Sequence, residues 1–339
     1  MIRECLVKLS QKQSLTEKET HEATLEILEG KAVPTQVAAY LAFLNLKGES
    51  TEEVVGSVKA MREKMTPVNA EGLNAIDVCG TGGDHKGTFN ISTVAAIVLA
   101  GSGVVVAKHG NRSASSQCGS AEVLDSLGVK LDPPSRTIEK SLKEANIAFL
   151  FAPHYHPAMK NVGPIRKDLG FRTLFNILGP MCNPASVKRQ VIGVFDMEKA
   201  RLMAEALVKS GSERVITLHS QEGLDEVSCA GPTTLFECSV GKGGEVQQYE
   251  ISPETFGFKR HDLMELKGSD AASNAKIVTE ILEGAKGPKR DAVVMNSAVG
   301  FYLAGKCPSI KEGKPLAEAS IDSGKALQAL KTLAAVSHQ

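Results

Sequence analysis

Residues 75–84 read AIDVCGTGGD, and this stretch decides the fold class. Its first half is an apolar run of strand length, and its second half is a glycine-rich loop. Glycines directly after a strand let backbone N–H groups approach an anion closely. The loop leads to residues 90–93 (NIST), which open an apolar helical stretch with further unpaired N–H groups. The stretch therefore predicts a strand, a phosphate-binding loop and a helix. A plain strand-to-helix turn, capped by Ser92 or Thr93, is the alternative.

Further apolar runs of strand length follow this unit. They are residues 103–107, 147–151, 190–194 and 214–218. Helical patterns separate most of them, as in α/β proteins whose sheet is largely parallel. We therefore predict a larger α/β domain over residues 71–339, built on a central, mostly parallel sheet.

The first 70 residues have a different pattern, with helical spacing and short loops. Thr16 begins a capping box, Pro34 suits the first position of a helix, and Thr51 can cap a third helix. We predict a small all-helical domain over residues 1–70. The long mixed segment 157–185, which lies between two strands, is expected to pack with it.

Composition excludes several classes of protein. Lys plus Arg and Asp plus Glu both total 39, so the formal net charge is zero and gives no bulk attraction to nucleic acid or membranes. Aromatic residues are 4% of the chain, too few for base-stacking surfaces. The seven cysteines form no Cys-x-x-Cys pair, which argues against a disulfide framework or a zinc site and indicates a reducing cytoplasm. We expect no nucleic-acid or membrane partner.

Polar residues follow two further predicted strands. Residues 108–112 (KHGNR) offer cations for phosphate, and the serines that follow can hold its oxygens. A solvated basic loop is the alternative, and Ser120 is expected to cap a helix in either case. Asp225 and Glu226 follow the strand at 214–218. Adjacent carboxylates are usually solvated surface, but beside two phosphate loops they suit magnesium that bridges to a pyrophosphate.

A third group of residues suits a flat organic substrate. Residues 152–160 (APHYHPAMK) carry aromatic and polar side chains, and Arg166 beyond them can pair bidentately with a carboxylate. For each histidine, a structural hydrogen-bonded role is equally consistent with the sequence.

In order and spacing, these motifs resemble those of anthranilate phosphoribosyltransferases over nearly the whole chain. The matching segments are residues 80–84, 90–93, 108–112, 151–166 (with the motif at 151–159), 172–173, 176–180, 183–184 and 223–226. The resemblance implies a nucleoside phosphorylase/phosphoribosyltransferase-like fold and a homodimer formed through the helical domain. It also implies transfer of a phosphoribosyl group from 5-phosphoribosyl diphosphate (PRPP) to anthranilate in tryptophan biosynthesis, with Mg²⁺ as cofactor.

The resemblance also implies three sets of binding residues. Those for PRPP are Gly80, Gly83, Asp84, Thr88, Asn90, Ile91, Ser92, Thr93, Lys108, His109, Gly110, Asn111, Arg112, Ser113, Ala114, Ser115, Ser116 and Ser120. Those for anthranilate are Gly80, His109, Asn111, His156, Arg166 and Pro180. Those for magnesium are Ser92, Asp225 and Glu226. Lys108 and Arg112 are expected to stabilise the departing pyrophosphate, and His109 to assist the attacking amine.

The chain departs from the family pattern at residues 115–119. Ser-Ser-Gln-Cys-Gly stands where Ser-Ser-Lys-Ser-Gly is expected, so the loop lacks one positive charge and one hydroxyl. Lower PRPP affinity, or compensation by magnesium, is expected from this change.

Three other functions are alternatives to this one. A related pyrimidine nucleoside phosphorylase should carry a Lys-x-Ser-x-Gly-Gly phosphate motif, which is absent. A non-enzymatic relative that binds nucleic acid is opposed by the zero net charge and by the Asp225–Glu226 pair. A helical interaction protein with an inactive α/β domain would consume no PRPP.

Overall fold

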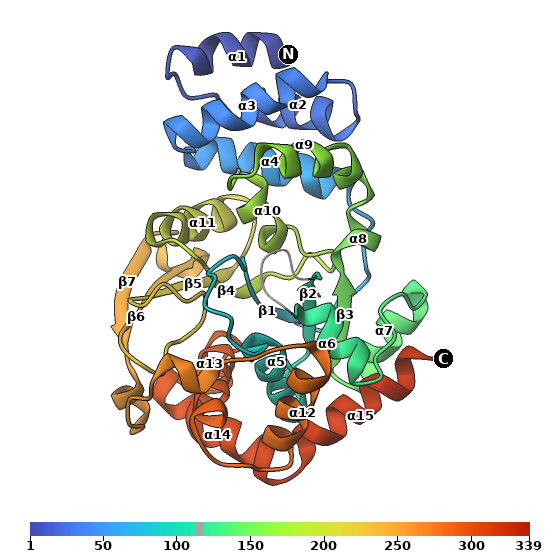
Figure 1. The fold of residues 1–339 in the computed structure, drawn as a ribbon, viewed down its shortest axis with the longest axis vertical. Coiled ribbons are helices and arrows are strands. Elements are labelled where there is room, and N and C mark those ends of the chain that lie inside the picture. The colour runs from blue at the N-terminus through green and yellow to red at the C-terminus, as the bar shows by residue number, and fades with distance from the viewer. Residues whose placement is uncertain (113–117) are drawn as a thin grey trace.

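The computed structural model describes residues 1–112 and 118–339, with the N-terminal helices stacked above a larger α/β region (Figure 1). The N-terminal helices are α1 (Ile2–Ser10), α2 (Glu17–Leu28), α3 (Pro34–Lys47) and α4 (Thr51–Lys64). Thr16 caps α2 in a capping box, and Pro34 begins α3, both as predicted. The predicted cap at Thr51 is wrong by one residue. Ser50 is extended and accepts the bond from the Glu53 N–H, whereas Thr51 is already helical.

A segment from the middle of the chain lies against these helices (Figure 1). It consists of η1 (Pro157–Asn161), α9 (Gly163–Leu169) and α10 (Phe175–Met181). η1 contacts α2, α9 contacts α3 and α10 contacts α4. The Asn161 side chain donates to the carbonyl of Leu28 at 2.8 Å. The middle segment therefore shares its packing with the N-terminal helices.

The strands form one sheet in the order β3-β2-β1-β4-β5-β6-β7. Their bounds are β1 (Ile76–Gly80), β2 (Val106–Gly110), β3 (Ile147–Phe151), β4 (Arg189–Gly193), β5 (Arg214–Ser220), β6 (Thr233–Ser239) and β7 (Val246–Ile251). β1 to β5 are parallel, as predicted, and β6 and β7 add an antiparallel edge. The strand predicted at 103–107 begins later, because Gly103 has a φ of 78° in a turn.

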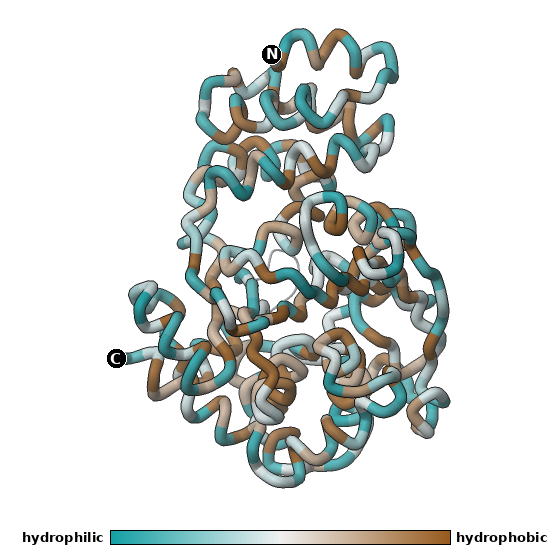
Figure 2. The backbone as a smooth tube through the Cα atoms, turned by 180° about the vertical axis from the view of Figure 1, so that it is seen from behind, coloured by the Kyte–Doolittle hydropathy of each residue, from teal (hydrophilic) through white to brown (hydrophobic). Residues whose placement is uncertain are grey.

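Helices cover both faces of this sheet and bury its apolar side chains. The remaining helices are α5 (Ile91–Gly101), α6 (Ser120–Ser126), α7 (Ser135–Glu144), α8 (Ala152–Tyr155), α11 (Met197–Lys209), η2 (Val240–Lys242), η3 (Pro253–Phe256), η4 (Leu263–Leu266), α12 (Ala271–Leu282), α13 (Pro288–Leu303), α14 (Ile310–Asp322) and α15 (Lys325–Ser337). Ile76 and Val78 pack with α5 and α13, while Cys79 and Ile192 belong to a core that continues into the N-terminal helices. Figure 2 shows these apolar stretches inside the α/β region. No helix in the described ranges has the length and apolar character needed to cross a membrane.

The strand order places the site. From β1 the chain adds β2 and β3 on one side and then crosses to β4 and β5 on the other, so β1 and β4 are neighbours. In open α/β sheets, ligands bind beyond the carboxyl ends of the strands at such a switch point. The glycine-rich loop after β1 lies at this point.

Candidate active site

The glycine-rich loop begins at Gly80, the last residue of β1. Gly82 and Gly83 have φ angles of 66° and 78°, which other residues adopt only with strain. The second half of the loop is held by a segment that the sequence analysis missed. The Phe89 N–H donates to the Leu266 carbonyl, and the Gly268 N–H donates to the Gly87 carbonyl, both at 3.0 Å. The sequence offers no signal for this pairing, because residues 266–268 carry no glycine-rich or charged pattern.

Asp225 and Glu226 turn back onto this loop and onto the start of α5. Asp225 Oδ2 accepts a hydrogen bond from the Gly82 N–H at 2.7 Å, and Glu226 Oε1 accepts one from the Ser92 N–H at 3.0 Å. Gly80 and Gly193 make room for this arrangement, since an added methyl group at either would overlap Asp225. Glycines at the ends of β1 and β4 therefore let the acidic segment cross the switch point.

The electrostatics of the acidic segment suit a bound cation. Burial, followed by the charge of Asp84, raises the pKa of Asp225, and burial with the charge of Asp225 raises the pKa of Glu226. Asp84 Oδ2 is buried without a hydrogen-bond partner. A divalent cation would relieve both the repulsion and the unpaired oxygen. Magnesium prefers oxygen ligands and keeps waters and substrate phosphates, so a few carboxylates beside a phosphate loop can hold it. The residues therefore fit Mg²⁺.

Lys108 and His109 project from the end of β2, as predicted. Lys108 is 2% exposed, and its ammonium donates to the Val78 carbonyl at 2.8 Å and approaches Ser92 Oγ at 3.4 Å. An ammonium has three donors, so Lys108 keeps one for a ligand. The structure thus brings Lys108, Ser92 and the acidic segment together at one site.

His109 lies beside His156, with ring centroids 5.1 Å apart and the planes tilted by 51°. Burial lowers the pKa of His109 to about 3 and that of His156 to about 4. Both rings are therefore neutral near pH 7. Nε2 of His109 and both ring nitrogens of His156 are buried without a well-formed hydrogen bond, although the backbone of Gly179 near His109 and that of Cys182 near His156 oppose the fall in pKa. Buried polar atoms are rarely left unpaired, so these nitrogens point to a ligand.

Two arginines come from α9 and from the connection between α9 and α10, and of these two Arg172 is bonded to the phosphate loop. The guanidinium of Arg166 lies 5.9 Å from the Phe175 ring, and burial lowers its pKa. Arg172 lies 4.0 Å over the Phe195 ring and donates to the Gly83 carbonyl in the phosphate loop. Sequence reasoning included Arg172 only as part of a motif and assigned it no role. Its cation ties the α9–α10 connection to the phosphate loop.

The other predicted residues occupy different places. Asn90 is the N-cap residue of α5, with Ile91 and Thr93 in its first turn, so the capping alternative for Ser92 or Thr93 is wrong. Ser120 is the first residue of α6, after the N-cap Gly119, and its hydroxyl donates to the Asn111 carbonyl at 3.2 Å. The expected cap at Ser120 is therefore wrong. Ser113, Ala114, Ser115, Ser116 and Gln117 lie outside the described residues.

Three further predicted residues have their own surroundings. Gly110 ends β2, Thr88 bridges to Lys267, and Pro180 lies within α10, where its carbonyl accepts a bond from Gln190 Nε2 at 2.9 Å. Arg112 lies 5.7 Å from the Phe151 ring and 3.9 Å from the Glu122 carboxylate. The structure does not bring Arg112 to Lys108, but places it beside a cavity of about 410 Å³ that Phe151 and His154 also line.

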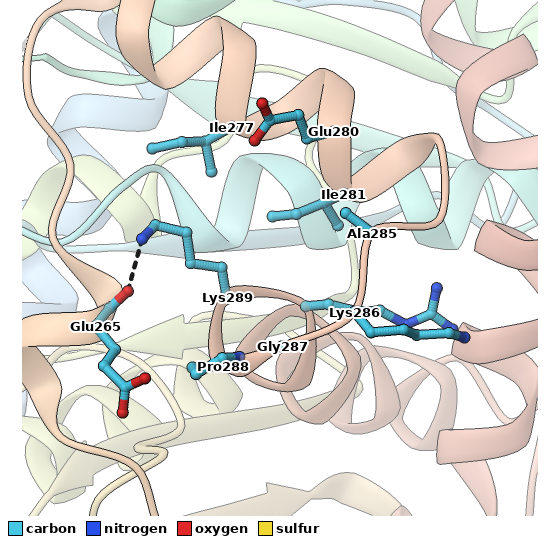
Figure 3. Close-up of a pocket in the computed structure, with 10 residues that line it drawn as sticks. Glu265, Ile277, Glu280, Ile281, Ala285, Lys286, Gly287, Pro288 and Lys289 are labelled. Atoms are coloured by element: carbon cyan, nitrogen blue, oxygen red, sulfur yellow. Dashed lines mark hydrogen bonds between the residues drawn. The ribbon is translucent and has the colours of Figure 1, made fainter.

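A second cavity, of about 350 Å³, lies between α12 and α13 (Figure 3). Its cations have partners within the protein. Lys289 donates to the Glu265 carbonyl at 2.6 Å, and Arg290 and Lys286 bind Asp322. None of the residues that line it belongs to the predicted motifs. The candidate site is therefore the region at the strand ends.

Comparisons with known proteins show the family of this chain. The model of the glycosyl transferase family a/b domain matches residues 72–327, and the model of its helical bundle domain matches residues 3–65. The anthranilate phosphoribosyltransferase of Rubrobacter xylanophilus is 48% identical, covering 100% of this chain and 98% of its own. That of Petrotoga mobilis is 45% identical, covering 97% of this chain and 94% of its own.

Solved structures give the same result. The crystal structure of anthranilate phosphoribosyltransferase from Thermus thermophilus has a TM-score of 0.92 and 41% identity, covering 98% of this chain and 99% of its own. The Saccharomyces cerevisiae enzyme in complex with PRPP and Mg has a TM-score of 0.90 and 31% identity, covering 99% of this chain and 98% of its own. With this fold, this switch-point site and these relatives, the chain belongs to the anthranilate phosphoribosyltransferase family.

Proposed function

We propose that the site at the ends of β1, β2 and β5 binds PRPP with magnesium, and that the neighbouring histidine pair with Arg166 and Pro180 binds anthranilate. The chain is a pentosyltransferase. It transfers the 5-phosphoribosyl group from PRPP to the amine of anthranilate, and the products are N-(5-phosphoribosyl)anthranilate and pyrophosphate. The reaction belongs to tryptophan biosynthesis.

One observation carries the proposal. The partly exposed carboxylates of Asp225 and Glu226 accept hydrogen bonds from the N–H groups of Gly82 and Ser92, at the switch point of the sheet. Carboxylates, a glycine-rich loop, a helix start and Lys108 together match a pyrophosphate that carries a divalent cation. Neither an anion alone nor a cation alone would use all of these groups.

The residues proposed for PRPP come from the loop after β1, the start of α5, the end of β2 and the segment that follows β2, of which residues 113–117 lie outside the described part of the chain. They are Gly80, Gly83, Asp84, Thr88, Asn90, Ile91, Ser92, Thr93, Lys108, His109, Gly110, Asn111, Arg112, Ser120 and the segment 113–116. Ser92, Asp225 and Glu226 would hold magnesium, which when bound supplies positive charge to the pyrophosphate. Lys108 stabilises the negative charge that develops on pyrophosphate as it leaves, together with backbone N–H groups of the loop. Arg112 is proposed for the same role.

The proposed chemistry needs positioning more than acid–base catalysis. The ribose carbon becomes oxocarbenium-like as pyrophosphate departs, and the anthranilate amine then forms the new bond to that carbon while losing a proton. The amine and the ribose carbon must be held in line for this step. Neutral His109 can accept a hydrogen bond from the amine, which orients its lone pair.

The proposed anthranilate residues suit a flat aromatic acid. They are Gly80, His109, Asn111, His156, Arg166 and Pro180. The buried imidazoles offer unpaired nitrogens and flat faces. The guanidinium of Arg166 can bind a carboxylate through two parallel hydrogen bonds, and its partial burial strengthens that pair.

We further propose that residues 1–70 with 157–185 form the helical domain, that residues 71–339 form the PRPP-binding domain, and that the chain is a homodimer in the cytoplasm. The matched family models support the boundary near residue 70, and the contacts of η1, α9 and α10 with α2, α3 and α4 support adding the segment 157–185. Exposed apolar side chains on the N-terminal helices support a second copy as partner, since Val7 is 60% and Leu46 79% exposed. Sedimentation velocity tests the dimer, and a monomer at micromolar concentration would contradict it.

The decay of anthranilate fluorescence tests the function. Mixing protein, PRPP and magnesium should remove the signal, and leaving out any one component should preserve it. Arg166→Ala and the double variant Asp225→Ala/Glu226→Ala should slow the decay. Folded protein that shows no decay with all components present would overturn the proposal and favour another acceptor.

A further inference from the structure

The sheet opens between β1 and β2 directly below the site. The register of this strand pair is Ile76 opposite Val106, whereas β1 and β4 stay paired as far as Gly80 and Gly193. In a parallel sheet, the backbone groups of adjacent strands normally bond to each other. Towards the carboxyl ends of β1 and β2, side chains instead form hydrogen bonds with the backbone of these strands.

Two of these side chains bond to backbone carbonyls in the opening. Lys108 donates to the Val78 carbonyl at 2.8 Å, and Asn183 Nδ2 donates to the Ala107 carbonyl at 2.8 Å. Both carbonyls belong to residues of this strand pair, and each accepts a hydrogen bond from a side chain. The opening is thus closed by polar side chains that come from the site and its border.

The third side chain is Asp77, the second residue of β1 and 0% exposed. Its Oδ1 accepts a hydrogen bond from the His109 N–H at 3.2 Å, and its Oδ2 accepts one from Asn183 Nδ2 at 2.8 Å. A buried carboxylate is costly, and an apolar residue would fill a central strand without that cost. Burial raises the pKa of Asp77 to about 6, with Lys108 opposing the shift. The site retains the carboxylate despite this cost.

Asn183 extends the contact to the anthranilate side. It follows α10, the helix that contains Pro180, and its Oδ1 accepts the Ala185 N–H at 2.8 Å. The Asp77 carboxylate therefore hydrogen-bonds both to the backbone of His109 and to Asn183, in the segment that follows Pro180. These two elements border the anthranilate site from the sheet and from the helical side.

We propose that Asp77, acting through Asn183 and the His109 backbone, is a positioning residue for the transfer reaction. It fixes the acceptor side of the site relative to the strand that carries the phosphate loop, so that the amine meets the ribose carbon in line. A displacement of about 1 Å at reacting atoms can slow a reaction by about a hundredfold. The inference rests on the proposed function.

The variant Asp77→Asn tests this role. An amide has the same shape, but its NH₂ group must face either the His109 N–H or the Asn183 NH₂, so one hydrogen bond becomes a contact between two donors. The kcat/KM for anthranilate should fall by about ten- to a hundredfold, because a misplaced acceptor lowers transition-state binding. The Kd for PRPP with magnesium, measured by calorimetry, should not rise, since Asp77 bonds to none of the proposed phosphate side chains and loss of its negative charge near Lys108 does not weaken an anionic ligand.

Glu237→Gln is the matched control. Glu237 is also a buried carboxylate of this sheet, but it bonds to Arg214 and Tyr249, which are outside the site. It should lower the melting temperature without changing kcat/KM. Equal effects of the two variants on kcat/KM, or a loss of stability in Asp77→Asn with native kinetics, would reduce Asp77 to a structural residue and overturn the proposal.

A second variant covers the case in which Asp77→Asn does not fold. Asn183→Ala removes the link to Pro180 but leaves Asp77 bonded to His109, and it should raise the anthranilate KM while PRPP binding is kept. Native anthranilate kinetics in Asn183→Ala would overturn the proposal. Failure of the proposed function is a different result, because the native protein would then show no turnover at all.

Discussion

The Asp225 carboxylate accepts a hydrogen bond from the Gly82 N–H, with 2.7 Å between Oδ2 and the nitrogen. Glu226 makes the same kind of bond with the Ser92 N–H at 3.0 Å. These N–H groups belong to the glycine-rich loop and the helix start, where an anionic ligand should bind. The carboxylates of Asp225 and Glu226 therefore occupy N–H donors that the proposed phosphate groups need. A bound cation would attract both the carboxylates and the phosphate groups, so that they share it as ligands.

The first prediction concerns Asp225→Ala and pyrophosphate. Without magnesium, at a pH above about 8 where both carboxyl groups have lost their protons, the variant should bind pyrophosphate several-fold more tightly than the native protein, because a competing negative charge has been removed. With magnesium, it should bind PRPP at least about tenfold more weakly, because a cation ligand is lost. Calorimetry measures both. Asp168→Ala, on the exposed face of α9, should change neither, and weaker metal-free pyrophosphate binding in Asp225→Ala would contradict the competition.

The second prediction concerns stability and pH without magnesium. The pKa values of Asp225 and Glu226 are raised mainly by burial, so the native state keeps these protons after the unfolded chain has lost them. The free energy of unfolding should therefore fall as the pH rises above about 4, the ordinary range of a carboxyl group. The variant Asp225→Asn/Glu226→Gln should flatten this decline. Melting temperatures across the pH range measure it, and an unchanged slope in the variant would exclude the pair as the cause.

Part of this site was predictable from the sequence, because its signals are local. Parallel strands are buried on both faces, so β3 appears as an unbroken apolar run, and glycines after β1 mark the loop. The edge strand β7 was missed because its side chains are largely exposed and polar. Asp77 was missed because its partners, His109 and Asn183, are distant in the chain, and a lone acid in a strand carries no periodic signal.

The third prediction concerns Gly80→Ala. The added methyl group would overlap the Asp225 carboxylate, so either β1 or the acidic segment must shift. Crowding of this kind usually costs about 1–3 kcal/mol of stability, and PRPP binding with magnesium should weaken as well. Chemical denaturation and calorimetry measure the two effects. Gly241→Ala, at a position with no neighbouring atoms within 4 Å, should behave like the native protein.

The fourth prediction concerns Arg166→Lys. Lysine keeps the positive charge but cannot form two parallel hydrogen bonds with a carboxylate. The anthranilate KM should rise by about tenfold or more, in line with the loss of one charge-assisted bond, and the KM for PRPP should stay the same. Lys167→Ala, the exposed neighbour on α9, is the control. A normal anthranilate KM in Arg166→Lys would remove Arg166 from the carboxylate site.

The fifth prediction concerns the pH dependence of anthranilate binding. Burial lowers the pKa of His109 to about 3 and that of His156 to about 4, below the ordinary value of about 6.5. Both rings therefore stay neutral from about pH 6 to about pH 8, and the anthranilate KM should show no histidine ionisation over that range.

The same shifts have a consequence for stability. A histidine whose folded pKa is depressed contributes stability above its unfolded pKa, and this stability is lost as the pH falls from about 6.5 towards the folded values. His156→Gln should therefore lessen acid destabilisation while raising the anthranilate KM, since glutamine lacks the flat ring. Initial rates and melting temperatures across the same pH series measure both effects. The contradicting result is an anthranilate KM that changes with an ionisation near pH 6.5 in the native protein but not in His156→Gln. It would mean that His156 titrates at its ordinary pKa and that burial does not keep the ring neutral.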